Sequence, residues 1–214
     1  DIFLEDTMWN GAADYRTLLT ADYLFINNQL AQFYGMTNEP LTRPSATLSP
    51  SDGEKNGARG NNSDFVKRKS ADGQRSGVLT HPYLLSAFAY QKQTSPIHRG
   101  VFLTRNIVGR TLKPPPMAVA FKDADFSPQL TMREKISELT RPQNCQTCHS
   151  VINPLGFSLE HFDAVGRFRT REQDRPIEAA SDYLTDEGET IHLSGARDIA
   201  QFAVSSEQAQ NAFI

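Results

Sequence analysis

Cysteine, excess basic charge and long apolar runs are all scarce or missing in this sequence. Only two of its 214 residues are cysteine, and a chain of this length buries enough surface to fold without disulfide staples. The formal net charge is -3 and the isoelectric point is about 6.0, which gives no support for a nucleic-acid or anionic-membrane partner. No apolar run reaches the roughly 18 residues that a membrane-spanning helix needs. The sequence therefore has the composition of an ordinary globular protein.

The two ends of the sequence lack the signals of a whole chain. It begins on Asp1 rather than on an initiator methionine, and its last residues keep a helical spacing with no closing signal. We expect the chain to be processed, trimmed or part of a longer polypeptide, and any export signal is not visible in it.

Helical spacing of apolar residues recurs along most of the sequence, so we expect a mainly α fold with long loops and a small β-hairpin near the C-terminus. Changes of composition divide the chain into residues 1–37 (helical), 38–77 (a loop or linker rich in Pro, Gly and Asn), 78–180 (helices around the cysteines) and 181–214 (a hairpin and the start of a C-terminal helical segment). Three helix starts carry N-cap signals: Ser95 before Pro96, Thr131 three residues before Glu134, and Asn153 before Pro154.

Both cysteines lie in "PQNCQTCHSVINPLGF", residues 142–157. The spacing C-x-x-C-H is typical of c-type haem attachment, because thiols on adjacent helical turns reach the two vinyl groups and the next histidine places an imidazole under the iron. Zinc is the main alternative, with Cys145, Cys148, His149 and His161 as four ligands of suitable type. A thioredoxin-like dithiol fits less well, since it requires a strand before the pair. We therefore expect one covalent haem c.

The sixth ligand of such a haem iron is not marked by the sequence. Small cytochromes c commonly use a downstream methionine, but Met8, Met36, Met117 and Met132 all precede the motif. His98 and His81 are the first candidates, both near predicted helix starts. Tyr90 is a weaker oxygen donor, and an open or water-bound iron is a further possibility. His192 alternates with apolar residues in a predicted strand, which favours an exposed face.

Haem propionates are anionic and pair well with the forked guanidinium group of arginine. Arg167 and Arg169 in "GRFRT" are close enough to the motif in sequence to serve. Solvent-exposed surface arginines are an equally simple interpretation of these two residues.

Several longer stretches together resemble the planctomycete-type cytochrome c proteins, large exported bacterial proteins built from domains of unknown function around one C-x-x-C-H haem segment. They are "GVLTHPYLLSAFAY", "SPIHRGVFLTRNIVGR", "TMREKI", "CQTCHSVINPLGFSLEHFDAVGRFR" and "RPIEAASDYL". The resemblance implies covalent haem on Cys145 and Cys148, His149 as the proximal ligand, and export to the periplasm or cell surface. It also implies that residues 1–37 are the helical end of a preceding domain and that residues 78–180 form a cytochrome c-like domain.

Three functions are compatible with these features. The first is electron transfer by a helical c-type cytochrome module that meets a redox partner protein. The second is a haem enzyme with an open distal site of the peroxidase or oxygenase kind, which the missing downstream methionine would allow. The third is a scaffold module of a larger extracellular assembly, in which haem or zinc is structural.

Overall fold

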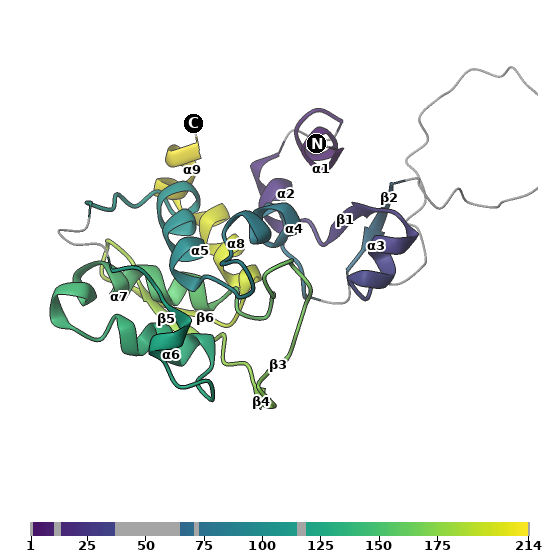
Figure 1. The fold of residues 1–214 in the computed structure, drawn as a ribbon. Coiled ribbons are helices and arrows are strands. Elements are labelled where there is room, and N and C mark those ends of the chain that lie inside the picture. Colours follow the sequence, from purple (N-terminus) through teal and green to yellow (C-terminus); the bar gives the residue numbers. More distant parts are fainter. Residues whose placement is uncertain (1, 11–13, 37–64, 71–72, 115–118, 214) are drawn as a thin grey trace, which may run out of the picture.

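The structure is a computed structural model, and it describes residues 2–10, 14–36, 65–70, 73–114 and 119–213 (Figure 1). The α-helices are α1 (Ile2–Met8), α2 (Tyr15–Thr20), α3 (Asn28–Phe33), α4 (Pro82–Ala87), α5 (Pro96–Phe102), α6 (Met132–Leu139), α7 (Gln143–Phe157), α8 (Ala196–Ser205) and α9 (Glu207–Phe213). Shorter turns are the 3-10 helices η1 (Gly77–Thr80) and η3 (Asp123–Asp125) and the π-helical turn η2 (Leu103–Ile107). The strands form three antiparallel pairs: β1 (Tyr23–Ile26) with β2 (Val66–Lys69), β3 (Arg171–Glu172) with β4 (Arg175–Pro176), and β5 (Ser181–Leu184) with β6 (Thr190–Leu193). The expectation of a mainly helical chain with a C-terminal hairpin is confirmed.

The N-terminal segment is less helical than we expected. Leu24 and Ile26 are buried and their neighbours are only partly so, which is the alternation of a strand, and β1 pairs with β2 from the expected loop 38–77. The prediction of a continuous helical segment is therefore wrong at Tyr23–Ile26, because a distant partner strand supplies the hydrogen bonds. Of that expected loop, residues 37–64 and 71–72 lie outside the described residues.

Two of the three predicted helix starts are confirmed. The Ser95 hydroxyl accepts a hydrogen bond from the backbone N–H of His98 at the start of α5, and Pro96 occupies the first turn. At α6, Thr131 and Glu134 cap each other reciprocally in the predicted capping box. These signals are local, so sequence neighbours alone determine them.

The third predicted start, at Asn153 and Pro154, is wrong. Helix α7 begins at Gln143 and continues through Pro154 to Phe157. Its C-terminal half packs against α5, where a Cβ atom on Gly100 would lie 2.2 Å from the Ile152 carbonyl oxygen and one on Gly156 would lie 2.1 Å from that of Pro96. The close packing that these distances describe surrounds Pro154, and we attribute to it the continuity of α7 through a residue that usually kinks or breaks a helix. Because Gly100 faces Ile152 and Pro96 faces Gly156, the two helices run antiparallel.

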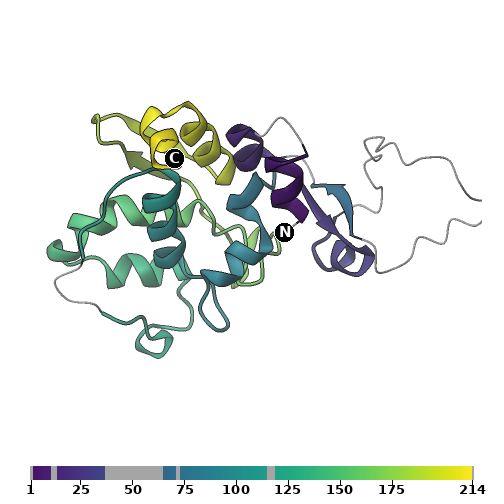
Figure 2. The ribbon, with the colours of Figure 1, turned by 90° about the horizontal axis from the view of Figure 1, so that it is seen from above.

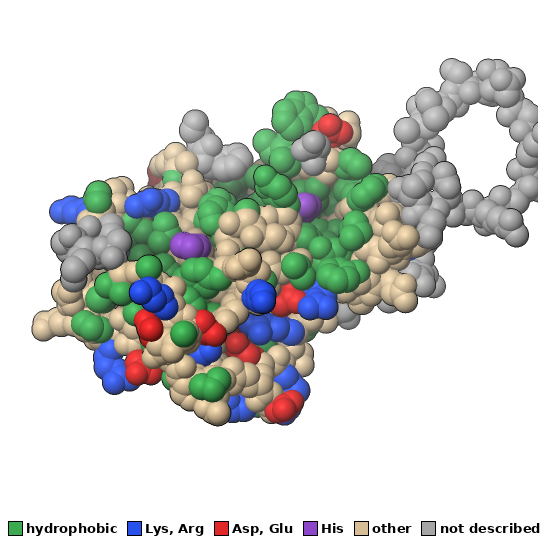
Figure 3. All heavy atoms as spheres, in the orientation of Figure 1, with side chains coloured by type: hydrophobic (Ala, Val, Ile, Leu, Met, Phe, Trp, Pro, Cys, Tyr) green, Lys and Arg blue, Asp and Glu red, His purple; other side chains and the backbone are tan. Residues whose placement is uncertain are grey.

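The main hydrophobic core joins segments from most of the chain, including Leu19 of α2, Leu103 of η2, Leu155 of α7, Tyr183 of β5 and Ile199 of α8. Seen from above, the C-terminal helices lie beside the N-terminal ones, while β1, β2 and α3 extend to one side (Figure 2). Figure 3 shows charged side chains of both signs intermixed on one face. Among the described residues, no helix is long and apolar enough to cross a membrane.

Candidate functional site

Helix α7 places Cys145 one turn before the neighbouring residues Cys148 and His149. Residues three and four apart lie on the same side of an α-helix, so the three side chains share a face. All three are half-buried, and both thiols are free. Two free thiols and an imidazole thus meet at one surface, as covalent haem attachment requires.

The ring of His149 is held from one side by the helix itself. Its Nδ1 lies 3.0 Å from Oδ1 of Asn153, one turn further along α7. Asn153 in turn donates from Nδ2 to the hydroxyl of Thr140 at 2.9 Å, and that hydroxyl donates to the Ile136 carbonyl oxygen at 2.8 Å. The contact uses Nδ1 and leaves Nε2, the other ring nitrogen, for a ligand. The motif residues therefore fit a haem iron on its proximal side.

His149, Asn153 and Thr140 also line a cavity of about 300 Å³. The hairpin strand β5 closes the other side with Ser181 and Asp182. The Ser181 hydroxyl is buried and has no hydrogen-bond partner within the described chain. This cavity is therefore polar and lies directly beside the candidate iron ligand.

His98 lies on α5, between the two points at which that helix touches α7. Its side chain is exposed, and its ring packs on Tyr90 with centroids 5.2 Å apart. Tyr90 stacks in turn on Phe121 at 4.8 Å. Two of the candidates for the distal ligand, His98 and Tyr90, are thus neighbours. Because His98 lies between Pro96 and Gly100, it is level with the C-terminal half of α7 rather than with His149.

His81 has a structural role at the start of α4. Its Nδ1 accepts a hydrogen bond from the Tyr83 backbone N–H, and its ring contacts Phe3 with centroids 5.5 Å apart. Burial lowers the pKa of His81 to about 4. These contacts tie His81 to the N-terminal helices and engage one of its ring nitrogens. Met117, in contrast, lies outside the described residues.

The two arginines proposed for the propionates already contact carboxylates. Arg167 pairs with Asp163 at 2.7 Å but leaves about half of its side chain exposed. Arg169 donates to Glu160 at 3.2 Å and lies 3.8 Å from Glu172. Propionate binding by either arginine stays a prediction, and Arg167 is the more accessible of the two.

Zinc ligation is not supported by the arrangement of the side chains. Within the described part of the chain, no three or more His, Cys, Asp or Glu residues are grouped to hold a metal ion. His161 instead contacts the Arg169 carbonyl oxygen through Nδ1 at 3.0 Å and stacks on Phe168. His192 lies on the exposed face of β6, as predicted, and contacts Asp182.

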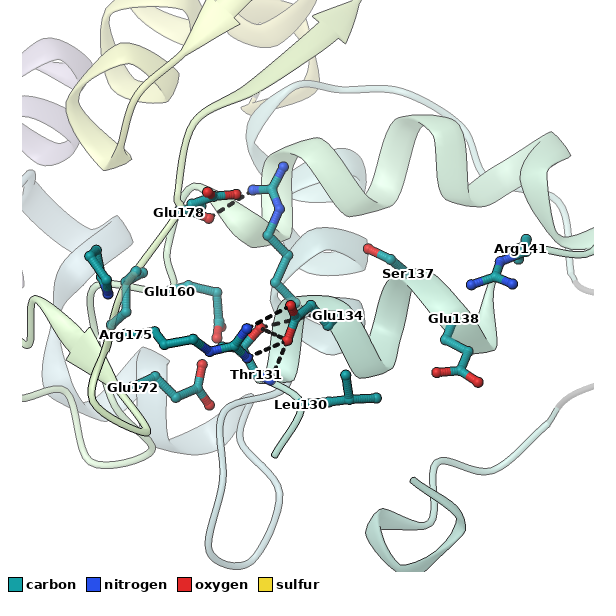
Figure 4. Close-up of a pocket in the computed structure, with 13 residues that line it drawn as sticks. Leu130, Thr131, Glu134, Ser137, Glu138, Arg141, Glu160, Glu172, Arg175 and Glu178 are labelled. Atoms are coloured by element: carbon teal, nitrogen blue, oxygen red, sulfur yellow. Dashed lines mark hydrogen bonds and ion pairs between the residues drawn. The ribbon is translucent and has the colours of Figure 1, made fainter. Parts of the chain in front are cut away.

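Sequence reasoning missed two features of this region. Asn153 was assigned to a helix start, although its spacing of four residues from His149 would have placed both on one helix face. Glu160 carried no signal at all, because only the folded chain buries it. Glu160 lines a charged cavity of about 550 Å³ between α6 and the β3–β4 segment. Figure 4 shows Glu172 and Arg175 at the same end of this cavity as Glu160. Glu138 and Arg141 lie at the other end.

Comparison with known proteins finds one family model that is similar to the central part of the chain. Residues 75–172 match PSCyt3, described as a protein of unknown function (DUF1588). No curated protein and no solved structure matches the chain. The resemblance to planctomycete-type cytochrome c proteins is confirmed by the family that matches. The matched segment contains helices α4 to α7 and, on α7, the C-x-x-C-H motif.

Proposed function

We propose that α7 carries one covalent haem c and that the protein is a c-type cytochrome module transferring single electrons in the periplasm or at the cell surface. Cys145 and Cys148 hold the porphyrin by thioether bonds, and Nε2 of His149 is the proximal iron ligand. A bound haem supplies an iron that changes between the ferric and ferrous states. A redox partner protein accepts or delivers the electron.

One observation carries this proposal: two free thiols and a histidine whose Nδ1 is already engaged lie on one face of α7. Ligating histidines generally donate their second ring nitrogen to a fixed acceptor, which holds the ring and its tautomer. Asn153 is such an acceptor. The family match over residues 75–172 supports the same function without specifying it.

Covalent attachment is tested by exporting the protein in a host with the c-type maturation machinery. We expect haem to remain with the chain after denaturation and solvent extraction, at one iron per chain. The double variant C145S/C148S should lose all extraction-resistant haem, whereas H192Q, which alters an exposed histidine, should keep it. A wild-type chain without bound iron, or with one zinc in its place, would contradict the proposal.

Carbon monoxide then separates electron transfer from small-molecule chemistry, because it binds ferrous haem only where a coordination position is open. We expect no spectral change in the wild-type protein and a clear change in H98Q, with His98 as the distal ligand. H81Q should behave as wild type, since His81 caps α4 and packs on Phe3. Carbon monoxide binding to the wild-type protein would instead favour a haem enzyme with an open distal site.

A further inference from the structure

Hydrogen bonds link Thr140, Asn153 and the candidate proximal ligand His149, and the donor and acceptor of each bond follow from the one before it. The chain of hydrogen bonds starts at Thr140, whose hydroxyl has one proton and donates it to the Ile136 carbonyl oxygen. The Thr140 oxygen can then only accept from Asn153, and the donor at 2.9 Å is Nδ2 of the amide. The Asn153 amide is therefore fixed in one orientation.

The direction of this chain determines the protonation of His149. With Nδ2 facing Thr140, the amide presents Oδ1 to His149, and an amide oxygen only accepts hydrogen bonds. His149 must therefore carry its proton on Nδ1, which leaves the lone pair of the neutral ring on Nε2. The folded chain thus selects the tautomer that a metal ligand needs.

Burial and helix geometry make the arrangement rigid. Asn153 is 8% exposed and Thr140 is 2% exposed, so water competes poorly for their hydrogen bonds. Asn153 stands four residues after His149 on the same helix, which keeps the two side chains adjacent. Its backbone is held in turn by the contacts of Ile152 and Gly156 with α5.

We propose that Asn153 is a positioning residue for the haem iron: its side-chain oxygen orients the His149 ring and sets the reduction potential through it. This inference rests on the proposed function, in which His149 is the proximal ligand. A hydrogen bond donated from Nδ1 increases the electron density on Nε2, which favours ferric over ferrous iron. The strength of the acceptor at position 153 therefore controls the potential.

Two substitutions change the acceptor in opposite directions. N153D puts a charged acceptor of the same shape beside His149 and should lower the reduction potential, whereas N153L removes the acceptor and should raise it. We expect each to change the ferric-to-ferrous ratio at a fixed applied potential by about tenfold or more, which is about 59 mV for a one-electron couple. The matched control is N106D, the same change at an exposed position on η2, and it should shift the ratio less than threefold.

In an H98Q background, where the distal position is open, the iron–histidine stretching frequency of the ferrous protein should follow the same order, highest in N153D and lowest in N153L. Equal potentials in N153D and N153L, or shifts no larger than that of N106D, would overturn the proposal. If a variant at position 153 does not fold, T140V is used in its place. This substitution removes the hydroxyl that accepts from Asn153, so the amide is free to turn. A reduction potential unchanged from wild type in T140V would equally overturn the proposal.

The tautomer is measured separately on the protein produced without haem. Long-range proton–nitrogen NMR spectra of the histidine rings should show Nδ1–H for His149 in the wild-type protein and a mixture of tautomers in N153L. If no haem attaches to the wild-type chain, the proposed function fails, and these spectra still test the role of Asn153. If haem attaches but His149 carries its proton on Nε2 in the haem-free protein, this inference alone fails.

Discussion

Arg99 and Glu160 are the two charged side chains that the described fold buries most completely, at 0% and 1% exposure. Arg99 donates to the carbonyl oxygens of Leu159, Phe162, Leu85 and Asp163, and so fastens the turn after α7 onto α5. Glu160 accepts hydrogen bonds from Thr94 at 2.9 Å and from Arg169 at 3.2 Å. A buried arginine with four carbonyl acceptors holds the loop in place, because its donors would otherwise be left without partners away from water.

Glu160 should make the stability of the protein depend on pH. Burial raises the pKa of its carboxyl to about 7, against the attraction of Arg99 and Arg169. In the unfolded chain the pKa has its ordinary value, 4.5. Between these values the folded state binds more protons than the unfolded state, so the free energy of unfolding falls as the pH rises from about 4.5 to about 7. We expect a loss of up to about 3 kcal/mol over that range.

To isolate this effect, the free energy of unfolding of wild type and E160Q is measured by urea unfolding at several pH values. E160Q should lack the loss between pH 4.5 and 7, because glutamine does not titrate. The control is E138Q, at an exposed glutamate lining the same cavity, which should keep the wild-type dependence. Parallel curves for wild type and E160Q would show that folding does not raise the pKa of Glu160.

At the scale of elements, the crossing of α5 and α7 decides where the motif lies. Gly100 and Gly156, one on each helix, bring the two backbones together, and neither position leaves room for a methyl group. The motif residues and Asn153 all lie on α7, one of the two crossing helices. The packing of α5 against α7 therefore determines where these side chains lie in the folded protein.

G156A should separate the two helices. Its Cβ would lie 2.1 Å from the Pro96 carbonyl oxygen, which is backbone and yields little. Overpacking of this kind costs about 1–3 kcal/mol, and the better helix propensity of alanine returns about 1 kcal/mol. Because the opposing atom is backbone, we take the upper end of the overpacking range, about 3 kcal/mol, and expect a net loss of about 2 kcal/mol in the free energy of unfolding, measured in guanidinium chloride.

The control for G156A is G195A, at a glycine with no atom within 4 Å of a Cβ and with an extended φ of 178°. It should change the stability by less than about 0.5 kcal/mol. If both variants unfold at the same denaturant concentration, the close approach of α5 and α7 is not a feature of the folded protein.

Elements whose limits depend on neighbours in sequence were predicted well. The caps at Ser95 and Thr131 were identified, because each requires one side chain and a backbone N–H a turn away. The hairpin around Gly188 was identified for the same reason: this glycine has a φ of 86°, in the left-handed region that glycine favours. Strand β1 and the continuous helix α7 were missed, because β2 and α5 stabilise them from outside the local sequence.

At the scale of the whole molecule, one core extends beyond the segment that matches the family. Residues 75–172 contribute Leu79, Leu103 and Leu155 to it, while Leu19 precedes that segment and Ile199 follows it. All five are completely buried. The flanking elements therefore cover apolar surface that the matched segment would otherwise expose.

We expect a fragment of residues 75–172 not to fold cooperatively. Removing α2, the β5–β6 hairpin and α8 uncovers the core residues that they bury, at a cost of about 25 cal/mol per Å² of apolar surface. The fragment should show a broad thermal transition and rapid proteolysis, and the chain of 214 residues should show a single sharp transition. A cooperative transition in the fragment would support the boundaries predicted at residues 78 and 180.

The sequence by itself determined the motif on which the proposed function rests: C-x-x-C-H on a helical segment, flanked by the stretches that resemble the PSCyt3 family. Attachment motifs can be recognised in this way because their spacing follows from one helix and its periodicity. Only the tertiary structure decided that Asn153 supports His149 and does not cap a helix, and that Glu160 is buried beside Arg99. Both outcomes depend on packing between segments distant in sequence, which fixes side-chain partners and solvent exposure only after the chain has folded.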